Sequence, residues 1–444
     1  MIPGAPLIVP GAILEAVSGR SWLAAMLEAE RALASAGAQA GVVPADAAAA
    51  IAEACSIDGY DWERLLVEGR STGNPAEPLV RALATRVGGD AARWVHHGAT
   101  SQDVMDTAAM LVSRRAIDLV LRDLSRVADA CSTLARVHRD TPMAGRTLLQ
   151  HAVPTTFGLK AAGWLVAVLD ARSRLVEIRE GGLAAQLGGA AGTMAALGER
   201  GVAVAALYAK ALELAEATVP WHANRVRIAE LGAALEIMAG VLAKVALDLQ
   251  LLAQTEVGEV REGGREGRSS AMPQKRNPVG AMWTRACAAL TRGHASVLTA
   301  ALAAEHERAA GAWQAEWAAL SGALATAGGA ATALAGALEG LEVDAGRMRA
   351  NLGLTGGQVA SERLASILAA RLGREEARAL VRAASLRAAE AGRPLAEELA
   401  TLDTGLTDAE LDAALDPTTY LGSAGVLVDR ALARYDIVRK EGNP

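Results

Sequence analysis

A polar loop is the segment of the sequence best suited to chemistry. It runs from Gly264 to Pro278 and places a serine pair, Ser269 and Ser270, directly after closely spaced glycines. Glycine permits backbone conformations that other residues disfavour, so hydroxyls and backbone N–H groups can approach a ligand. Lys275 and Asn277 then add a cation and an amide, donors that suit a carboxylate. The composition predicts an anion-binding segment, with an ordinary surface turn as the alternative.

A second polar cluster, from His96 to Asp103, interrupts the apolar pattern just before a long helical stretch. Thr100 and Ser101 stand where that helix should begin, and such residues commonly cap the backbone N–H groups of a first turn. A cap site still leaves N–H groups for an anion. The cluster therefore predicts a helix cap or a carboxylate site, and the two roles can coexist.

Three further segments are polar or glycine-rich: 145–158, 186–193 and 305–308. The last reads Glu-His-Glu-Arg and falls within a predicted long helix. Taken alone, such a quartet is typical of a solvated charged face. None of the His and Glu groupings has the His-Glu-x-x-His spacing of a zinc site, so we expect no metal and no cofactor.

The elements that must position these residues are helices, because apolar residues recur at three- and four-residue steps. The first helix is expected from Ser21 to about Ala36, with Gly37 as its stop, and Pro44 opens a second. A helix that begins at Pro278 would add an N-terminal dipole that favours an anion. Long helices are predicted at about 103–138, 155–180, 225–260, 278–310 and 313–338, and shorter ones at 358–372 and 375–391.

Helices of this length usually pair side by side in bundles. We therefore predict an all-α chain in three parts: an N-terminal helical domain at 1–104, a central long-helix bundle at 105–340 and a small C-terminal helical domain at 341–444. Apolar faces left over on such a bundle favour oligomerisation. Residues 318–338 carry no charge. We interpret them as a buried helix, because Ala, Gly, Ser and Thr are too weakly apolar to span a membrane.

Composition narrows the class of partner. The net charge is −6, with no basic block. We therefore expect no nucleic-acid partner. The three cysteines, Cys55, Cys131 and Cys287, lie far apart, which is typical of reduced, buried thiols in a cytoplasmic protein. No signal peptide is recognisable, so we predict a cytoplasmic protein without a membrane partner.

The loop also resembles a known signature. Its stretch Gly267-Arg268-Ser269-Ser270-Ala271-Met272-Pro273-Gln274-Lys275-Arg276-Asn277-Pro278 is similar to the Gly-Ser-Ser-x-Met-Pro-x-Lys-x-Asn-Pro of the fumarase/aspartase superfamily. Arg268 stands where the family has Gly, which can alter how the loop closes. The resemblance covers nearly the whole chain. It implies that Ser269 is the general base and that Lys275 and Asn277 bind a substrate carboxylate.

One departure from the family bears on the reaction. The segment 145–158 resembles the family's Gly-x-Thr-His-x-Gln-x-Ala-x-Pro, but Leu148 replaces the histidine. Superfamily members remove a proton next to a carboxylate and expel a group from the β carbon. A departing amine or hydroxide gains about 10²–10⁴ in rate from a general acid. A carboxylate, whose conjugate acid has a pKa of about 4, leaves unaided near neutral pH. Leu148 therefore favours a carboxylate leaving group.

The bacterial 3-carboxy-cis,cis-muconate cycloisomerases of protocatechuate degradation are the branch that fits. In that branch a carboxylate oxygen adds to a conjugated acid and gives 4-carboxymuconolactone, and Trp usually stands at the position of Leu148. The resemblance implies a small tricarboxylate substrate and a homotetramer with shared active sites. The implied carboxylate-binding residues are Thr100, Ser101, Lys275 and Asn277, and those that orient the rest of the substrate are Arg308, Thr147 and Gln150, with His97 and His151 as further contributors.

Three alternatives stay open. Adenylosuccinate lyase is the first, since 96–103 and 155–158 resemble it too, although Leu148 cannot protonate its amine leaving group. A lyase acting on another substituted succinate is the second, and the departures at Arg268 and Leu148 favour it. An inactive relative that only binds a ligand is the third, against which the retained Ser269, Lys275 and Asn277 argue.

Overall fold

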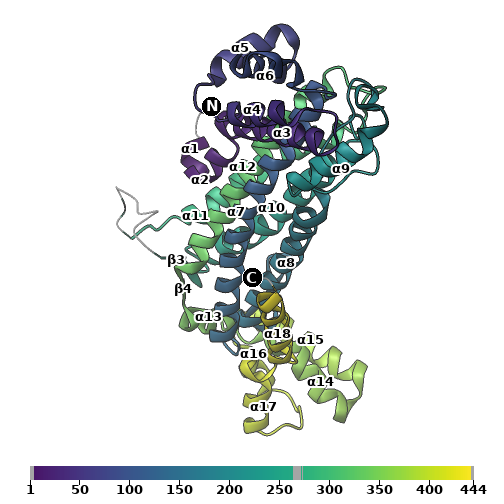
Figure 1. Ribbon diagram of the computed structural model, residues 1–444. Coiled ribbons are helices and arrows are strands. Elements are labelled where there is room, and N and C mark those ends of the chain that lie inside the picture. Colours follow the sequence, from purple (N-terminus) through teal and green to yellow (C-terminus); the bar gives the residue numbers. More distant parts are fainter. Residues whose placement is uncertain (1–4, 264–271, 273, 442–444) are drawn as a thin grey trace. The chain divides into compact units, whose positions relative to one another are not determined.

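The structure is a computed structural model that describes residues 5–263, 272 and 274–441 (Figure 1). Helices dominate it, which confirms the all-α prediction. The chain forms two compact units. Unit 1 consists of Met1–Ser125, Asp170–Lys244 and Met282–Leu334, and unit 2 of Arg126–Leu169, Val245–Ala281 and Ala335–Pro444. The three-part division at 1–104, 105–340 and 341–444 stays a prediction.

Several helices are long, and five of them continue from one unit into the other. These are α7 (Ser101–Val137), α8 (Phe157–Glu177), α10 (Val226–Leu252), α11 (Val279–Ala300) and α12 (Ala312–Glu339). The other helical elements of unit 1 are α1 (Ala5–Ile8), α2 (Gly11–Ala16), α3 (Gly19–Gln39), α4 (Ala45–Ala54), α5 (Trp62–Thr72), α6 (Ala76–Val87), η1 (Asp90–Trp94), η2 (Ile178–Gly182), η3 (Ala195–Arg200) and α9 (Gly201–Ala211).

The N-terminal helix α3 is longer than predicted. The Ser18 hydroxyl accepts a hydrogen bond from the Ser21 N–H at 3.1 Å and caps its start. The predicted stop at Gly37 is wrong, because the helix continues to Gln39. A Cβ at Gly37 would lie 2.6 Å from the Val43 side chain. The glycine therefore serves close packing against the following turn and does not end the helix.

Small residues let the long helices of unit 1 approach one another closely. A Cβ at Gly232 of α10 would lie 3.0 Å from Leu298 of α11, and one at Gly322 of α12 would lie 2.4 Å from the His294 ring of α11. Thr332 of α12 donates a hydrogen bond to Asp123 of α7. These contacts confirm the predicted bundle of long helices.

Helix α12 contains the charge-free stretch. Among the described residues it is the one helix long and apolar enough to cross a membrane, by length and composition alone. Its most apolar window is 72% buried inside the protein. A helix that is apolar all round and buried by its neighbours is a core helix, as we predicted for residues 318–338.

The helix predicted at 278–310 ends early. Helix α11 stops at Ala300, and residues 301–311 form turns and bends. His306 has a φ of 47° and Gly311 a φ of 118°, and an α-helix accommodates neither value. Arg308 therefore lies in a loop and not on a helix, contrary to the prediction.

Unit 2 contains two short antiparallel ladders, which the sequence analysis did not predict. Strand β1 (Pro142–Thr147) pairs with β2 (Gln150–Thr156), with a register shift between Ala144 and Arg146. Strand β3 (Val260–Glu262) pairs with β4 (Leu341–Val343). The remaining elements are α13 (Ala345–Leu352), η4 (Gln358–Ala360), α14 (Ser361–Leu372), α15 (Arg374–Ala391), α16 (Leu395–Leu399), α17 (Asp408–Leu415), η5 (Pro417–Thr419) and α18 (Ala424–Glu441).

Helices α14 to α17 share a small core of their own. Leu364 and Leu368 of α14 pack with Val381 of α15, and Leu395 and Leu399 of α16 complete the buried cluster. The shorter helices predicted at 358–372 and 375–391 correspond to η4 with α14 and to α15. Figure 1 shows these helices together in the yellow-green part of the chain.

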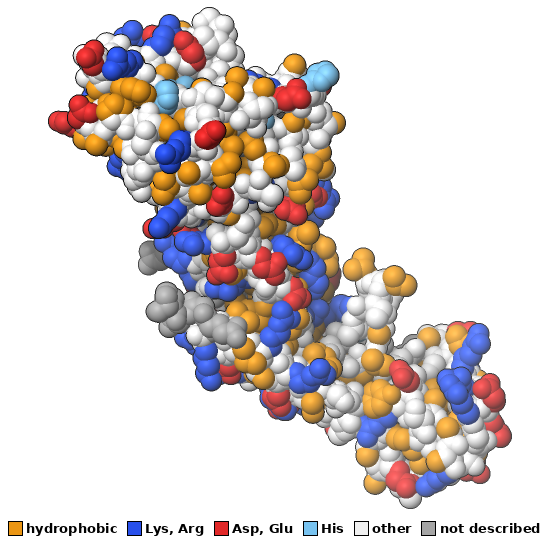
Figure 2. Space-filling model, turned by 45° about the vertical axis from the view of Figure 1, so that its right-hand side comes forward, with side chains coloured by type: hydrophobic (Ala, Val, Ile, Leu, Met, Phe, Trp, Pro, Cys, Tyr) orange, Lys and Arg blue, Asp and Glu red, His pale blue; other side chains and the backbone are white. Residues whose placement is uncertain are grey.

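Two long helices of unit 1 keep large apolar side chains in solvent. Met282, Leu290 and Val297 recur along α11 at a spacing that places them on one face, and they are 43%, 47% and 38% exposed. Val226 and Ile237 are likewise exposed, and their spacing places them on one face of α10. On the face drawn in Figure 2, exposed hydrophobic side chains lie among the charged ones.

Candidate active site

One buried carboxylate holds the first turn of α7. Asp103 accepts hydrogen bonds from the N–H groups of Thr100, Gly188 and Gly189, each at 2.9 Å. His222 Nε2 lies 2.6 Å from the same carboxylate, and Asp103 is 1% exposed. Its bond to the Thr100 N–H is the one a capping box uses, so the cluster does cap the helix. Asp103 thereby ties the start of α7 to the glycine-rich turn at 186–193.

The capping arrangement leaves the predicted ligand groups available. Thr100 and Ser101 are partly exposed, and their hydroxyls make no hydrogen bond within the described part of the chain. Asp103 engages backbone N–H groups rather than these hydroxyls. The two roles considered for this cluster are therefore compatible in the same turn, and the substrate contacts of Thr100 and Ser101 stay a prediction.

The structure brings Arg308 to this turn. Its Nε donates to Gln102 Oε1 at 3.0 Å, and its Nη2 donates to the Ala190 carbonyl at 3.1 Å. Three segments that the sequence analysis singled out separately, 96–103, 186–193 and 305–308, thus meet in unit 1. A partly buried guanidinium held at the turn that carries Thr100 and Ser101 suits a carboxylate ligand.

A buried ion network supports the same turn. Arg225 donates to both oxygens of Asp106, at 2.8 and 3.0 Å, and to Glu316 through its Nε at 2.9 Å. Trp313 Nε1 and Gln102 Nε2 also donate to Asp106, at 3.0 and 3.2 Å. The side chains of Arg225, Asp106 and Glu316 are at most 3% exposed. Burial lowers the pKa of Arg225, but its two carboxylate partners outweigh that effect and hold the pKa above its ordinary value.

None of the charged residues of this network was among the predicted site residues. A local signal existed, because Gln102, Asp103 and Asp106 are polar residues directly before the apolar run at 108–112. Arg225 and Glu316 lie 119 and 210 positions beyond Asp106, so nothing in their own surroundings indicated that they meet it.

The neighbouring histidines have different surroundings. His96 Nδ1 lies 2.6 Å from the buried Glu30 carboxylate. Burial lowers the pKa of His96, yet Glu30 outweighs it and the pKa is raised overall. His97 packs edge-on against Trp94, with ring centroids 5.0 Å apart. His97 is partly exposed, and its substrate contact stays a prediction.

In unit 2, the predicted residues Thr147 and Gln150 pair across the tip of the β1–β2 hairpin. The tip itself is Leu148 and Leu149, with φ angles of 51° and 65°. Positive φ at both central residues is typical of a type I′ turn, which favours Asn and Gly. Leu148 is 96% exposed and Leu149 76%. The residue at the position of the family histidine thus projects from the hairpin into solvent in the single chain.

His151 lies opposite Arg146 in the same hairpin. Its Nδ1 is buried without a hydrogen-bond partner among the described residues. Burial lowers the pKa of His151, and the charge of Arg146 adds to the effect. Arg146 itself forms a bidentate pair with the fully buried Glu259, at 2.6 and 2.9 Å, and Asn351 donates to Glu259 at 2.7 Å. This pair anchors the hairpin close to its tip, because Arg146 directly precedes Thr147.

The signature loop is described only in part. Ser269 lies outside the described residues. Lys275 is exposed and Asn277 partly buried, in the segment that leads into α11. Glu262 accepts hydrogen bonds from the N–H groups of Gly280 and Ala281, each at 2.9 Å. The start of this helix thus holds an anion, as expected, but the anion at these two first-turn donors is a carboxylate of the chain itself.

The predicted residues thus form separate groups. His97, Thr100, Ser101 and Arg308 belong to unit 1, and Thr147, Gln150, His151, Lys275 and Asn277 belong to unit 2. Among the described residues, no hydrogen bond or ion pair joins Lys275 or Asn277 to the hairpin. No cluster of three or more His, Cys, Asp or Glu side chains in that part of the chain could hold a metal ion.

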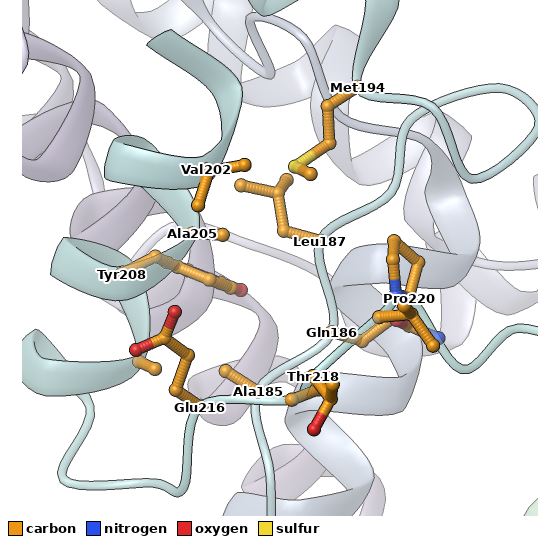
Figure 3. Close-up of a pocket in the computed structure, with 13 residues that line it drawn as sticks. Ala185, Gln186, Leu187, Met194, Val202, Ala205, Tyr208, Glu216, Thr218 and Pro220 are labelled. Atoms are coloured by element: carbon orange, nitrogen blue, oxygen red, sulfur yellow. The ribbon is translucent and has the colours of Figure 1, made fainter.

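A small cavity lies behind the glycine-rich turn (Figure 3). Its volume is about 70 Å³, and Gln186, Tyr208 and Glu216 are among the residues that line it. Sites for small molecules are usually about 300–1,000 Å³. The cavity is therefore too small for a tricarboxylate, and none of the predicted site residues lines it.

Comparison with known proteins decides the family. A family model described as "Lyase" matches residues 11–293, and one described as "Adenylosuccinate lyase C-terminus" matches residues 357–431. The chain belongs to the fumarase/aspartase superfamily.

The relatives within the superfamily match over almost their whole length. A nitrosuccinate lyase of Streptomyces davaonensis is 51% identical, and the match covers 95% of this chain and 92% of the lyase's chain. A 3-carboxy-cis,cis-muconate cycloisomerase of Pseudomonas aeruginosa is 47% identical, and the match covers 96% of this chain and 95% of the Pseudomonas chain. The crystal structure of a 3-carboxy-cis,cis-muconate lactonizing enzyme from Pseudomonas putida superposes with a TM-score of 0.92 at 43% identity and covers 98% of this chain and 99% of that one.

The hairpin tip of this superfamily member provides a first prediction. Replacing Leu148 by Asn and Leu149 by Gly should stabilise the protein by about 1 kcal/mol or more, because left-handed backbone is costly for leucine. We expect the melting temperature to rise by about 1–3 °C in calorimetry. Leu66→Asn, an exposed leucine on α5 with helical backbone, serves as the control and should not stabilise. A fall in melting temperature for the hairpin variant would mean that the two leucines are buried by another chain.

Proposed function

We propose that this superfamily member is a 3-carboxy-cis,cis-muconate cycloisomerase, which interconverts 3-carboxy-cis,cis-muconate and 4-carboxymuconolactone. The observation that carries the proposal is Leu148, which supplies no proton donor where the family has histidine. A carboxylate leaving group needs none. The Pseudomonas cycloisomerases, similar over nearly the full chain, support the same assignment. The enzyme would act in the cytoplasm, in protocatechuate degradation.

The proposed reaction balances as an isomerisation with uptake of one proton. A carboxylate oxygen of the substrate forms a C–O bond at the carbon β to a second carboxylate. The electron pair of the double bond moves to the α carbon and is held as an aci-carboxylate, and a proton is then added to that carbon. The trianionic substrate becomes a dianionic lactone, and in the reverse direction the ring oxygen departs as carboxylate.

The proposed reaction requires a group that transfers a proton at the α carbon and groups that stabilise the carboxylate charges. Ser269 exchanges the proton at the α carbon. Thr100, Ser101, Lys275 and Asn277 hold the carboxylate that becomes the aci form, because preorganised donors stabilise charge that develops in the transition state. Arg308, which Gln102 and the Ala190 carbonyl orient, binds a further carboxylate. The residues proposed to position the remainder are Thr147, Gln150, His97 and His151.

We propose that the active form is a homotetramer whose sites are shared between chains. The exposed apolar faces of α10 and α11 support this assembly, since a soluble monomer rarely leaves such faces in water. Light scattering should give four times the 45.6 kDa chain mass. The mass of a monomer or dimer would contradict it.

A lyase acting on nitrosuccinate is the second candidate, and the Streptomyces davaonensis relative favours it. Elimination from nitrosuccinate would release nitrite, a weak base like a carboxylate, so Leu148 is compatible with this reaction too. The two substrates differ in the number of carboxylates. Adenylosuccinate fits less well, since its amine leaving group requires a proton that Leu148 cannot supply.

An assay with the three substrates separates these functions. Purified protein is mixed with 3-carboxy-cis,cis-muconate, nitrosuccinate or adenylosuccinate. Loss of the diene absorbance is expected for the first, with kcat/KM at least tenfold above the values for the others. Release of nitrite at a higher kcat/KM would replace the cycloisomerase assignment by the second candidate, and formation of AMP would overturn both. Turnover of none of them would leave two readings: a lyase acting on another substituted succinate, and the inactive relative.

A further inference from the structure

None of the described residues that are assigned to the site lines the groove between α14 and α15. Its volume is about 700 Å³, within the usual range of about 300–1,000 Å³ for small-molecule sites. Both helices belong to unit 2 and pack on the cluster formed by Leu364, Leu368 and Val381. Both helices contribute residues to the lining of the groove. Its floor includes the short side chains of Ala365 and Ala369.

Three arginines of α15 line one wall of the groove: Arg374, Arg378 and Arg382. They are four positions apart and therefore share a helix face. A rise of about 1.5 Å per residue separates neighbours by about 6 Å along the axis. Glu362 is the one carboxylate among the lining residues, so the groove carries net positive charge in a chain whose net charge is −6.

These arginines are weakly paired. Arg378 lies 4.0 Å from Glu375, and both side chains are mostly exposed, at 57% and 90%. Within the described residues, neither Arg374 nor Arg382 forms an ion pair. The groove carboxylate Glu362 instead accepts a hydrogen bond from the Tyr420 hydroxyl at 3.4 Å. The guanidinium groups thus keep their donors available.

The arrangement costs the folded chain stability. Like charges four positions apart on a helix repel each other and destabilise it. Arg374 is the first residue of α15, where the helix dipole disfavours a cation. Glu375 and Glu376 in the same turn offset part of that effect. Binding sites often contain like charges that repel one another and destabilise the ligand-free protein. A ligand of opposite charge removes the repulsion.

We propose that this groove binds a small multivalent anion that carries two or more phosphate or carboxylate groups. Guanidinium groups bind both kinds of group through paired N–H donors. Successive arginines about 6 Å apart suit a ligand whose charges are separated, rather than a single monovalent ion. The hydroxyls of Ser361 and Ser385, 3.2 Å apart, add neutral donors at one end of the groove. This proposal does not depend on the proposed function.

Calorimetric titration of the full-length protein tests it, with inorganic triphosphate and citrate as probes at fixed ionic strength. We expect one site per chain for at least one probe, and the double variant Arg378→Gln/Arg382→Gln should bind it at least tenfold more weakly. The probe that binds more tightly identifies the phosphate or the carboxylate class. Arg371→Gln is the matched control, because that arginine of α14 pairs with Glu410 outside the groove and should leave binding unchanged.

A second readout separates binding from a structural role. Without anion, the double variant should melt at the same temperature as the parent or higher, because repulsion is removed. A lower melting temperature would assign the arginines to stability and overturn the proposal. Absence of saturable binding for both probes would also overturn it. So would binding that survives in the double variant but is lost in Lys275→Gln, since the anion would then occupy the predicted active site.

Discussion

Ser269→Ala is expected to lower turnover by about 10²–10⁴-fold, the contribution of a positioned proton-transfer group. The reason is that the proposed reaction moves a proton at the carbon next to a carboxylate, and alanine has no hydroxyl to exchange it. The measurement is the initial rate of absorbance loss with 3-carboxy-cis,cis-muconate. Substrate binding should persist, because Lys275, Asn277 and the unit 1 residues are unchanged.

Ser270→Ala is the matched control for this variant, since it removes the neighbouring hydroxyl from the same loop. It should keep turnover within about tenfold of the parent, well inside the range expected for loss of a general base. Circular dichroism and light scattering should be the same for all three proteins. Near-normal turnover of Ser269→Ala would contradict the role assigned to this serine.

Arg225→Met should destabilise the fold by about 3–5 kcal/mol. The change leaves Asp106 and Glu316, each 3% exposed, without their shared cation. An uncompensated buried charge is far more costly than a lost surface pair. The expected observation is a fall of several degrees in melting temperature, together with a lower denaturant midpoint.

Arg292→Met provides the comparison. Its pair with Glu236 has a similar distance of 3.1 Å, but the two side chains are 75% and 39% exposed. Its loss should cost no more than about 1 kcal/mol. The triple variant Asp106→Asn/Arg225→Met/Glu316→Gln should recover much of the stability lost in Arg225→Met, because no charge then stays buried. Equal losses for Arg225→Met and Arg292→Met would disprove the explanation.

Helical periodicity was sufficient to predict most of the long helices. Helices α7 and α12 begin and end within about two residues of the predicted bounds. The errors lie where tertiary contacts override local preference. Gly37 stays within α3 because Val43 packs on it, and the predicted helix at 278–310 gives way to turns after Ala300. The β1–β2 hairpin was missed because Leu148 and Leu149 lack the usual turn residues.

The same distinction between local pattern and tertiary contact applies to the candidate site. Residues within one local motif, such as Thr100 and Ser101, could be selected from sequence because type and spacing suffice. Arg308 was selected on a helix that does not exist there, and its contact with Gln102 required the structure. The pairing of Arg225 with Asp106 and Glu316 could not be predicted, since charged residues on helices, such as these two carboxylates, ordinarily indicate a solvated face. Only the folded chain shows that these charges are buried together.

Asp103 and the hairpin tip impose opposite constraints on how new substrate preferences can evolve. Asp103 joins Thr100, the glycine-rich turn and His222 in one set of bonds. A mutation there would therefore disturb folding before it could alter selectivity. Leu148 and Leu149 contribute little to the core of their own chain. Relatives that evolve to act on a substrate with a different leaving group should accordingly vary first at positions 148 and 149, because the fold tolerates mutation at the hairpin tip best.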